Sequence, residues 1–259
     1  MARPIVFINA GHGGNDPGAV AYGLVEKSLN LTMALACRDE LIRHDVVVVM
    51  SRAKDENDKL VDVCREANNS GAIIALSFHN NAGKGDGWEA LVNLNNPVSV
   101  KIAKLAEKYV KELGQNSRGL KDGNWLYFVA NTDMPALLFE SAFLDNDIDN
   151  DIVDTVAEQK AFGVAHAKAV LEYLGIAYKN EGTSKPTATV TPANKSFLVR
   201  VKISDLRIRK GPGTNYGSTG FIKPGAYTIV ETKEAGGYTW GKLKSGAGWI
   251  ALKYTEKVS

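Results

Sequence analysis

The chain has 259 residues, of which 44% are hydrophobic and 23% charged, with a formal net charge of +2. This length suits one large domain or a medium and a small one, and the composition is that of a globular protein with a real core. No apolar stretch approaches the roughly 18 residues of a membrane span, and the run Ile5–Ile8 is too short for a signal peptide.

Residues 1–178 alternate short apolar runs with amphipathic helical patterns. The predicted strands are Ile5–Ile8, Val46–Met50, Ala72–Phe78, Glu89–Leu94, Trp125–Val129 and Ala136–Phe139. The predicted helices are Glu26–Arg43, Asp58–Asn68, Ser99–Leu113 and Ile152–Leu174. Several strands are continuously apolar, which is typical of strands covered on both faces. We therefore expect an α/β fold with a doubly covered, mainly parallel twisted sheet of about six strands in a domain spanning residues 1–178.

Residues 179–195 are polar, contain two prolines and lack apolar periodicity, which predicts a flexible linker. In residues 196–259 the spacing of the apolar residues differs from that in residues 1–178. Short apolar runs at Phe197–Val201, Leu206–Arg209, Gly220–Ile222, Tyr227–Val230, Trp240–Leu243 and Gly248–Ile250 are separated by glycine-rich turns. This spacing predicts a small all-β barrel as a second domain.

The small net charge hides an asymmetry between the two parts. Residues 196–259 carry 11 Lys and Arg against 4 Asp and Glu, whereas residues 1–178 carry 17 against 24. The basic C-terminal part should therefore favour a polyanionic surface. Cys37 and Cys64 lack Cys-x-x-Cys spacing, so we expect two reduced, mostly buried thiols.

Four polar residues of the N-terminal part lie beside predicted strand ends or turns. His12 follows the first strand, His79 follows the third, and Glu140 ends the last. Loops at the carboxyl ends of parallel strands meet at one edge of a sheet, so these three should converge. Glu26 opens a helix after a glycine-rich loop and can reach the same edge. Two imidazoles and a carboxylate suit a catalytic zinc ion with an open fourth position, and a spare carboxylate suits a base for water.

Each of these residues also has a structural interpretation when it is taken alone. A single buried histidine is more often a hydrogen-bonded core residue than a ligand, and Glu26 could serve its helix dipole. Glu140 interrupts the apolar run Ala136–Phe139, where an unpaired carboxylate is costly, so a functional role is favoured there. His44 and His166 lie away from predicted strand ends, and we interpret both as structural.

The four residues fall within segments that resemble a known family. The segments are Asn9–Ala19, Glu26–Leu31, Ser77–Asn81 and Met134–Glu140. They resemble, in this order, the zinc-dependent N-acetylmuramoyl-L-alanine amidases of the family often called amidase-3, which cleave peptidoglycan. The resemblance spans about residues 4–174 and implies that Zn2+ is held by His12, Glu26 and His79, with Glu140 as the catalytic glutamate. Asn9-Ala10 stands where the family usually has Asp-Pro, and this departure affects only a contact with the residues that surround the metal ligands.

The C-terminal part resembles bacterial SH3-like (SH3b) wall-targeting domains at Leu206–Tyr216 and Gly248–Ile250. Its lysines are either a solvated face or an aid to attachment on a wall rich in anionic polymer. We expect Trp240 and Trp249 in the barrel core.

The two resemblances imply a peptidoglycan hydrolase in which zinc-activated water cleaves the amide between N-acetylmuramic acid and L-alanine. A zinc endopeptidase or carboxypeptidase, and a non-catalytic wall-binding protein, remain as alternatives. The partner is expected to be the bacterial cell wall, with no nucleic acid and no membrane insertion. Without a signal peptide, we expect synthesis in the cytoplasm and release by a separate holin-like protein, as for a phage endolysin; a lysis enzyme of sporulation is the other origin. The sequence leaves open whether Asn81 touches substrate.

Overall fold

The computed structural model describes residues 3–179, 196–204, 206–214, 216–236 and 238–258. The chain divides into two compact units, Met1–Lys179 and Asn180–Ser259, and each has its own hydrophobic core. The predicted linker over residues 179–195 lies outside the described residues except for Lys179. Within the described ranges, no helix combines the length and apolar character needed to cross a membrane.

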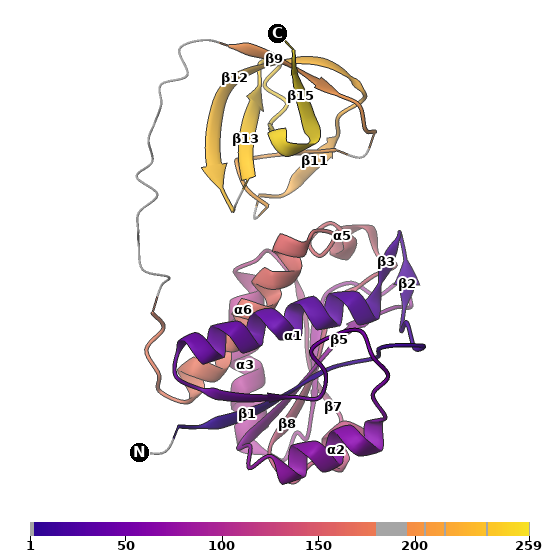
Figure 1. Ribbon diagram of the computed structural model, residues 1–259, viewed down its shortest axis with the longest axis vertical. Helices are drawn as coiled ribbons and strands as arrows, with labels where there is room; N and C mark the ends of the chain where they lie inside the picture. Colours follow the sequence, from indigo (N-terminus) through magenta and orange to yellow (C-terminus); the bar gives the residue numbers. More distant parts are fainter. Residues whose placement is uncertain (1–2, 180–195, 205, 215, 237, 259) are drawn as a thin grey trace. The chain divides into compact units, whose positions relative to one another are not determined.

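The N-terminal unit is built on a central sheet with helices packed around it (Figure 1). The sheet has six strands in the order β4-β1-β5-β8-β6-β7. The strands are β1 (Ile5–Ala10), β4 (Val47–Met50), β5 (Ile74–Asn81), β6 (Trp88–Val92), β7 (Ser117–Asp122) and β8 (Ala136–Phe143). Strands β4, β1, β5 and β8 run parallel, β6 pairs antiparallel with β8, and β7 pairs parallel with β6. The expected six-stranded α/β sheet is confirmed, as a mixed sheet in which one neighbour pair reverses direction.

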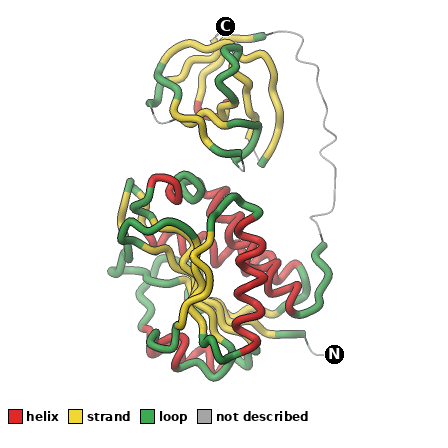
Figure 2. The backbone as a smooth tube through the Cα atoms, turned by 180° about the vertical axis from the view of Figure 1, so that it is seen from behind, coloured by secondary structure: helices red, strands yellow, loops and turns green. Residues whose placement is uncertain are grey.

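Helices cover both faces of this sheet (Figure 2). On one face lie α1 (Glu26–Arg43), α3 (Pro97–Lys111) and α6 (Val156–Tyr173), and on the other lie α2 (Leu60–Asn69) and the short α4 (Tyr127–Ala130). Successive strand residues point to opposite faces, so Val6 and Ile8 pack in the first core while Phe7 packs in the second. A short hairpin of β2 (Val20–Ala21) and β3 (Leu24–Val25) precedes α1, and α5 (Asp147–Asn150) follows β8.

The predicted strand at Trp125–Val129 is wrong. The structure places a strand earlier, at Ser117–Asp122, and turns the chain at Gly123 before α4 begins at Tyr127. Trp125 is 74% exposed, so its apolar character does not reflect a place in the sheet. The true strand β7 is an edge strand with several exposed residues, which removes the continuous apolar run by which a buried strand is recognised.

The C-terminal unit is one seven-stranded antiparallel sheet with the order β11-β10-β14-β13-β12-β9-β15. The strands are β9 (Phe197–Val201), β10 (Arg207–Arg209), β11 (Ser218–Phe221), β12 (Gly225–Ala235), β13 (Tyr238–Leu243), β14 (Trp249–Ala251) and β15 (Thr255–Val258). The expected all-β character is confirmed, and β15, which the sequence pattern does not predict, pairs with β9. Trp240 and Trp249 are buried, as expected.

Candidate metal centre

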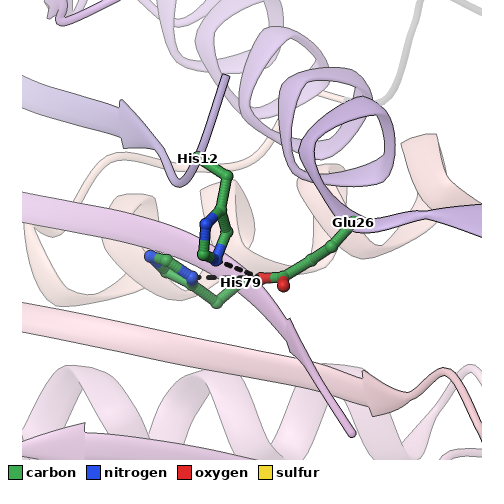
Figure 3. Close-up of side chains that lie close together, drawn as sticks. All are labelled: His12, Glu26 and His79. Atoms are coloured by element: carbon green, nitrogen blue, oxygen red, sulfur yellow. Dashed lines mark hydrogen bonds and ion pairs between the residues drawn. The ribbon is translucent and has the colours of Figure 1, made fainter. Parts of the chain in front are cut away.

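Two imidazoles and one carboxylate meet at the carboxyl edge of the sheet (Figure 3). His12 lies in the loop after β1, His79 lies near the end of β5, and Glu26 is the first residue of α1. Glu26 Oε1 is 3.2 Å from His12 Nε2 and 3.1 Å from His79 Nδ1. One possible ligand atom from each of the three residues lies within 4.8 Å of the other two. The structure therefore brings together the three residues that the sequence singled out as metal ligands.

The spacing of these atoms fits a zinc ion. Ligands about 2.0–2.1 Å from a tetrahedral ion are about 3.3 Å apart, close to the separations between Glu26 and each imidazole. Two neutral nitrogens and one carboxylate oxygen are also the donor types that zinc prefers, and three protein ligands leave a fourth position for water or substrate. The residues present therefore fit a catalytic zinc site.

Glu26 is fixed from several sides. Its Oε2 accepts a hydrogen bond from the backbone N of Ala19 at 2.8 Å, and its Oε1 accepts from Asn30 Nδ2 and the backbone N of Asn80, each at 3.1 Å. Burial alone would raise the pKa of this carboxyl, but the hydrogen bonds to His12 and His79 outweigh burial and hold its pKa well below the ordinary value. Glu26 is thus a buried, ionised carboxylate in a preorganised position.

His12 is oriented by a residue that the sequence analysis missed. Its Nδ1 lies 2.8 Å from Asp16 Oδ2, and because an ionised carboxylate only accepts, Nδ1 donates this hydrogen bond while Nε2 points toward Glu26. The hydrogen bond to Glu26 is the largest influence and, with Asp16 and against burial, raises the pKa of His12 to about 9. Only its place four residues after His12 in the same loop hints at Asp16.

Glycines leave room for these side chains. His12 itself has a φ of 60°, and Gly18 has a φ of 64°. A Cβ on Gly18 would lie 2.3 Å from Glu26 Oε2, and one on Gly11 would lie 2.1 Å from His79 Cε1. No side chain fits at either position, so the close approach of loop and ligands requires glycine.

A buried arginine joins the two segments that carry His12 and Glu26. Arg52, 2% exposed, follows β4 and donates from Nε to Ala10 O at 2.8 Å. Its Nη2 donates to Gly11 O and Lys27 O at 3.0 and 2.9 Å, and its Nη1 donates to Lys54 O at 3.1 Å. These bonds tie the start of the His12 loop to the first turn of α1. The charge is solvated by backbone carbonyls in place of water.

Glu140 lies beside this group, in register with His79 across the β5–β8 pair. Its Oε2 is buried and has no hydrogen-bond partner among the described residues. Burial is the main reason that its pKa is raised well above the ordinary value, and the carboxylates of Glu26 and Glu89 add to the shift. A carboxyl with a raised pKa and an unused oxygen, next to a candidate metal site, has the properties of a general acid–base group.

The other polar residues considered in the sequence lie elsewhere. His166 is buried between aromatic rings of the core, and His44 bonds Glu40 O and the backbone N of Lys179. Neither joins the ligand cluster within the described part of the chain. Asn81 donates from Nδ2 to Glu89 Oε1 at 3.0 Å, so its amide nitrogen holds another side chain.

A mixed α/β sheet that brings two imidazoles, a buried carboxylate and a carboxyl of raised pKa to one edge has the construction of a metal-dependent hydrolase. Comparison with known families makes the class specific. Residues 6–172 match the family model described as N-acetylmuramoyl-L-alanine amidase, and the chain belongs to this family and is an enzyme of this class.

Individual relatives agree with the family. The chain is 35% identical over 184 residues to the N-acetylmuramoyl-L-alanine amidase CwlM of Bacillus licheniformis, covering 67% of this chain and 72% of that protein. It is 29% identical over 254 residues to the endolysin of Bacillus phage SPP1, covering 93% of each. The solved catalytic domain of CwlV, an amidase of Bacillus (Paenibacillus) polymyxa, superposes with a TM-score of 0.62 at 29% identity, covering 67% of this chain and 99% of that one.

Proposed function

We propose that this protein is a zinc-dependent peptidoglycan hydrolase that cleaves the amide between N-acetylmuramic acid and L-alanine. The observation that carries the proposal is the convergence of His12 Nε2, Glu26 Oε1 and His79 Nδ1, with Glu140 on the neighbouring strand. The family to which the chain belongs supports the choice of bond. The roles are His12, Glu26 and His79 as zinc ligands and Glu140 as the catalytic acid–base residue.

A bound zinc ion would supply Lewis acidity, which lowers the pKa of a water molecule and polarises the scissile carbonyl. Glu140 accepts a proton from the attacking water and returns it to the nitrogen of the leaving L-alanine. Its raised pKa suits both steps, because a group that titrates nearer to neutral pH can accept and release the proton. Asp16 and Asn30 keep the side chains of His12 and Glu26 oriented during turnover.

Metal analysis and product analysis test this proposal together. The purified protein should hold about one zinc per chain, and His12→Ala should lose it while a Lys121→Gln control on an exposed residue retains it. Mass spectrometry of digested wall should find released stem peptides with a new amine on L-alanine. Stems that stay on the sugar would instead indicate an endopeptidase or carboxypeptidase. Wall suspensions that the protein leaves uncleared would indicate a binding protein.

We further infer that the C-terminal unit is an SH3-like (SH3b) module that attaches the enzyme to the bacterial wall. Its all-β sheet and its excess of 11 Lys and Arg over 4 Asp and Glu in residues 196–259 support this role. Lys233 and Lys242 belong to this excess of cations; they lie 5.7 and 5.8 Å from the ring of Trp249 and pair with Glu231 at 3.9 and 3.4 Å. Replacing both by Gln should weaken cosedimentation with walls and reduce its salt dependence, with unchanged activity on soluble muramoyl peptides.

We propose an endolysin as the setting of this activity. The phage endolysin that aligns over 93% of both chains supports this choice over a sporulation enzyme. The protein would then be made in the cytoplasm and reach the wall after release by a separate holin-like protein. Expression in a host cell with and without such a membrane-permeabilising protein tests this, because lysis should require it.

A further inference from the structure

A row of ionisable side chains crosses four neighbouring strands at the active-site edge. His79 on β5 is in register with Glu140 on β8, and Glu140 is in register with Glu89 on β6. Arg118 on β7 lies in the bulge opposite the Trp88–Glu89 step. With strands about 4.8 Å apart, the backbone of Arg118 is about 10 Å from that of Glu140. The row leads away from the candidate ligands in one direction, toward β7.

Arg118 is held in this row by two contacts. Its Nε donates to Glu89 Oε2 at 2.8 Å, and its guanidinium carbon lies 5.1 Å from the centre of the Phe143 ring. The other oxygen of Glu89 accepts a hydrogen bond from Asn81 at 3.0 Å, so Glu89 is itself fixed. The guanidinium is therefore positioned before any substrate arrives.

The outer end of Arg118 is available for a ligand. Among the described residues, the only hydrogen bond of its side chain is the one made by Nε, and the side chain is 42% exposed. The two terminal nitrogens, Nη1 and Nη2, thus keep parallel N–H groups that can bind one carboxylate in a bidentate manner. If Arg118 served only to neutralise Glu89, the pair would need no such exposed end.

The substrate implied by the proposed function is asymmetric in charge about the scissile bond. On the sugar side, the lactyl carboxyl is consumed in the amide itself. On the peptide side, a free carboxylate can follow L-alanine by one residue, about 7 Å along an extended chain. This length and the reach of an arginine side chain together span the separation between Glu140 and Arg118.

We infer that Arg118 binds a carboxylate of the stem peptide and so fixes the direction of the substrate. This inference rests on the proposed function. The peptide lies across β8, β6 and β7, and the sugar lies on the side of His12 and α1. In this orientation the leaving nitrogen is next to Glu140, which must protonate it, and the peptide continues in the same direction past Glu89.

Two soluble substrates test the inference. They are N-acetylmuramoyl-L-alanyl-γ-D-glutamyl-L-lysine and its D-isoglutaminyl counterpart, which differ only in a carboxylate or a carboxamide on the residue after L-alanine. The zinc-loaded wild-type protein should prefer the carboxylate, and Arg118→Gln should lose about 10- to 100-fold in kcat/KM on it, mainly through KM. On the carboxamide substrate, the kcat/KM of Arg118→Gln should differ from that of the wild type by less than about threefold. Arg118→Lys should recover part of the loss, since lysine restores the positive charge but lacks the two parallel N–H groups of the guanidinium.

Lys121→Gln on the same strand is the matched control, because it removes an exposed cation outside the row. Equal losses of Arg118→Gln on both substrates, or no preference of the wild-type protein, would overturn the inference and leave Arg118 as a structural partner of Glu89. Failure of the wild-type protein to cut the muramoyl–alanine amide in either substrate would overturn the proposed function, and this inference with it.

Discussion

The burial of His166 in the core makes the stability of this enzyme depend on pH, and His166→Gln should remove the part of that dependence that this histidine causes. His166 is fully buried, and its Nδ1 lies 2.7 Å from Phe162 O. Its Nε2 accepts a hydrogen bond from Trp88 Nε1 at 3.1 Å. Because the indole N–H can only donate, Nε2 must be unprotonated. A second proton on the imidazole would face the indole N–H donor among aromatic side chains, and no carboxylate of the described residues bonds the imidazole to stabilise the charge.

The size of the effect follows from the pKa of this imidazole. Burial lowers the pKa of His166 from 6.5 to about 4. The unfolded chain therefore binds a proton below pH 6.5 that the folded protein binds only near pH 4, so the free energy of unfolding falls as pH drops through this window. A difference of about 2.5 pH units corresponds to a loss of about 3 kcal/mol. His12, whose pKa is raised to about 9, adds stability as pH falls toward 6.5 and contributes no further change below that pH. Its contribution is the same in wild type and in His166→Gln, so it cancels in their comparison.

Urea unfolding at several pH values between 7.5 and 4 measures the effect. Circular dichroism at 222 nm reports on the N-terminal unit, which contains all α-helices of the described residues. Buried carboxyls such as Glu140 also titrate, so the quantity to compare is the difference between wild type and His166→Gln. At pH 7.5 His166→Gln should have a lower free energy of unfolding than the wild type. Between pH 7.5 and pH 4 the free energy of unfolding of the variant should rise by about 3 kcal/mol relative to that of the wild type. Parallel curves for the two proteins would refute the reasoning.

Three further substitutions test the active site. Glu140→Gln should lower kcat by about 10²- to 10⁴-fold with unchanged zinc content and unchanged or higher stability, since it removes a buried carboxylate; lost zinc would contradict the role. Asp16→Ala should weaken zinc binding by about 10- to 100-fold in chelator competition, because His12 loses the acceptor that orients it. Arg52→Met should lower the free energy of unfolding by about 3–5 kcal/mol, since four carbonyls lose their donor; a change within 1 kcal/mol in urea titrations would contradict it.

The sequence predicts the centre of the site better than its surroundings. His12, His79 and Glu140 could be placed because each follows or ends a continuously apolar strand, and strand ends of one sheet converge. Asp16 and Arg118 carry no such signal, because an exposed polar residue in a loop or an edge strand looks like any solvated residue. Their roles depend on distances that only the folded chain defines.

The strands of the N-terminal sheet also divide into those that the sequence predicts and those that it does not. Strands β1, β5 and β8 are recognisable because both of their faces are buried, which produces uninterrupted apolar runs. The edge strand β7 is polar, and the exposed Trp125 after it mimics a strand residue. The antiparallel direction of β6 leaves no mark in a period-2 pattern, since alternation is the same in either direction.

The reversal between β8 and β6 also divides the loops of the sheet into two groups with different freedom to change. Residues 82–87 and 112–116 enter β6 and β7 at the catalytic edge, whereas residues 93–96 and 123–126 leave them at the far edge. Insertions at the far edge should be tolerated without any change in substrate range. Diversification of substrate range, in nature or by directed evolution, should instead concentrate in the two loops that enter beside Glu89 and Arg118.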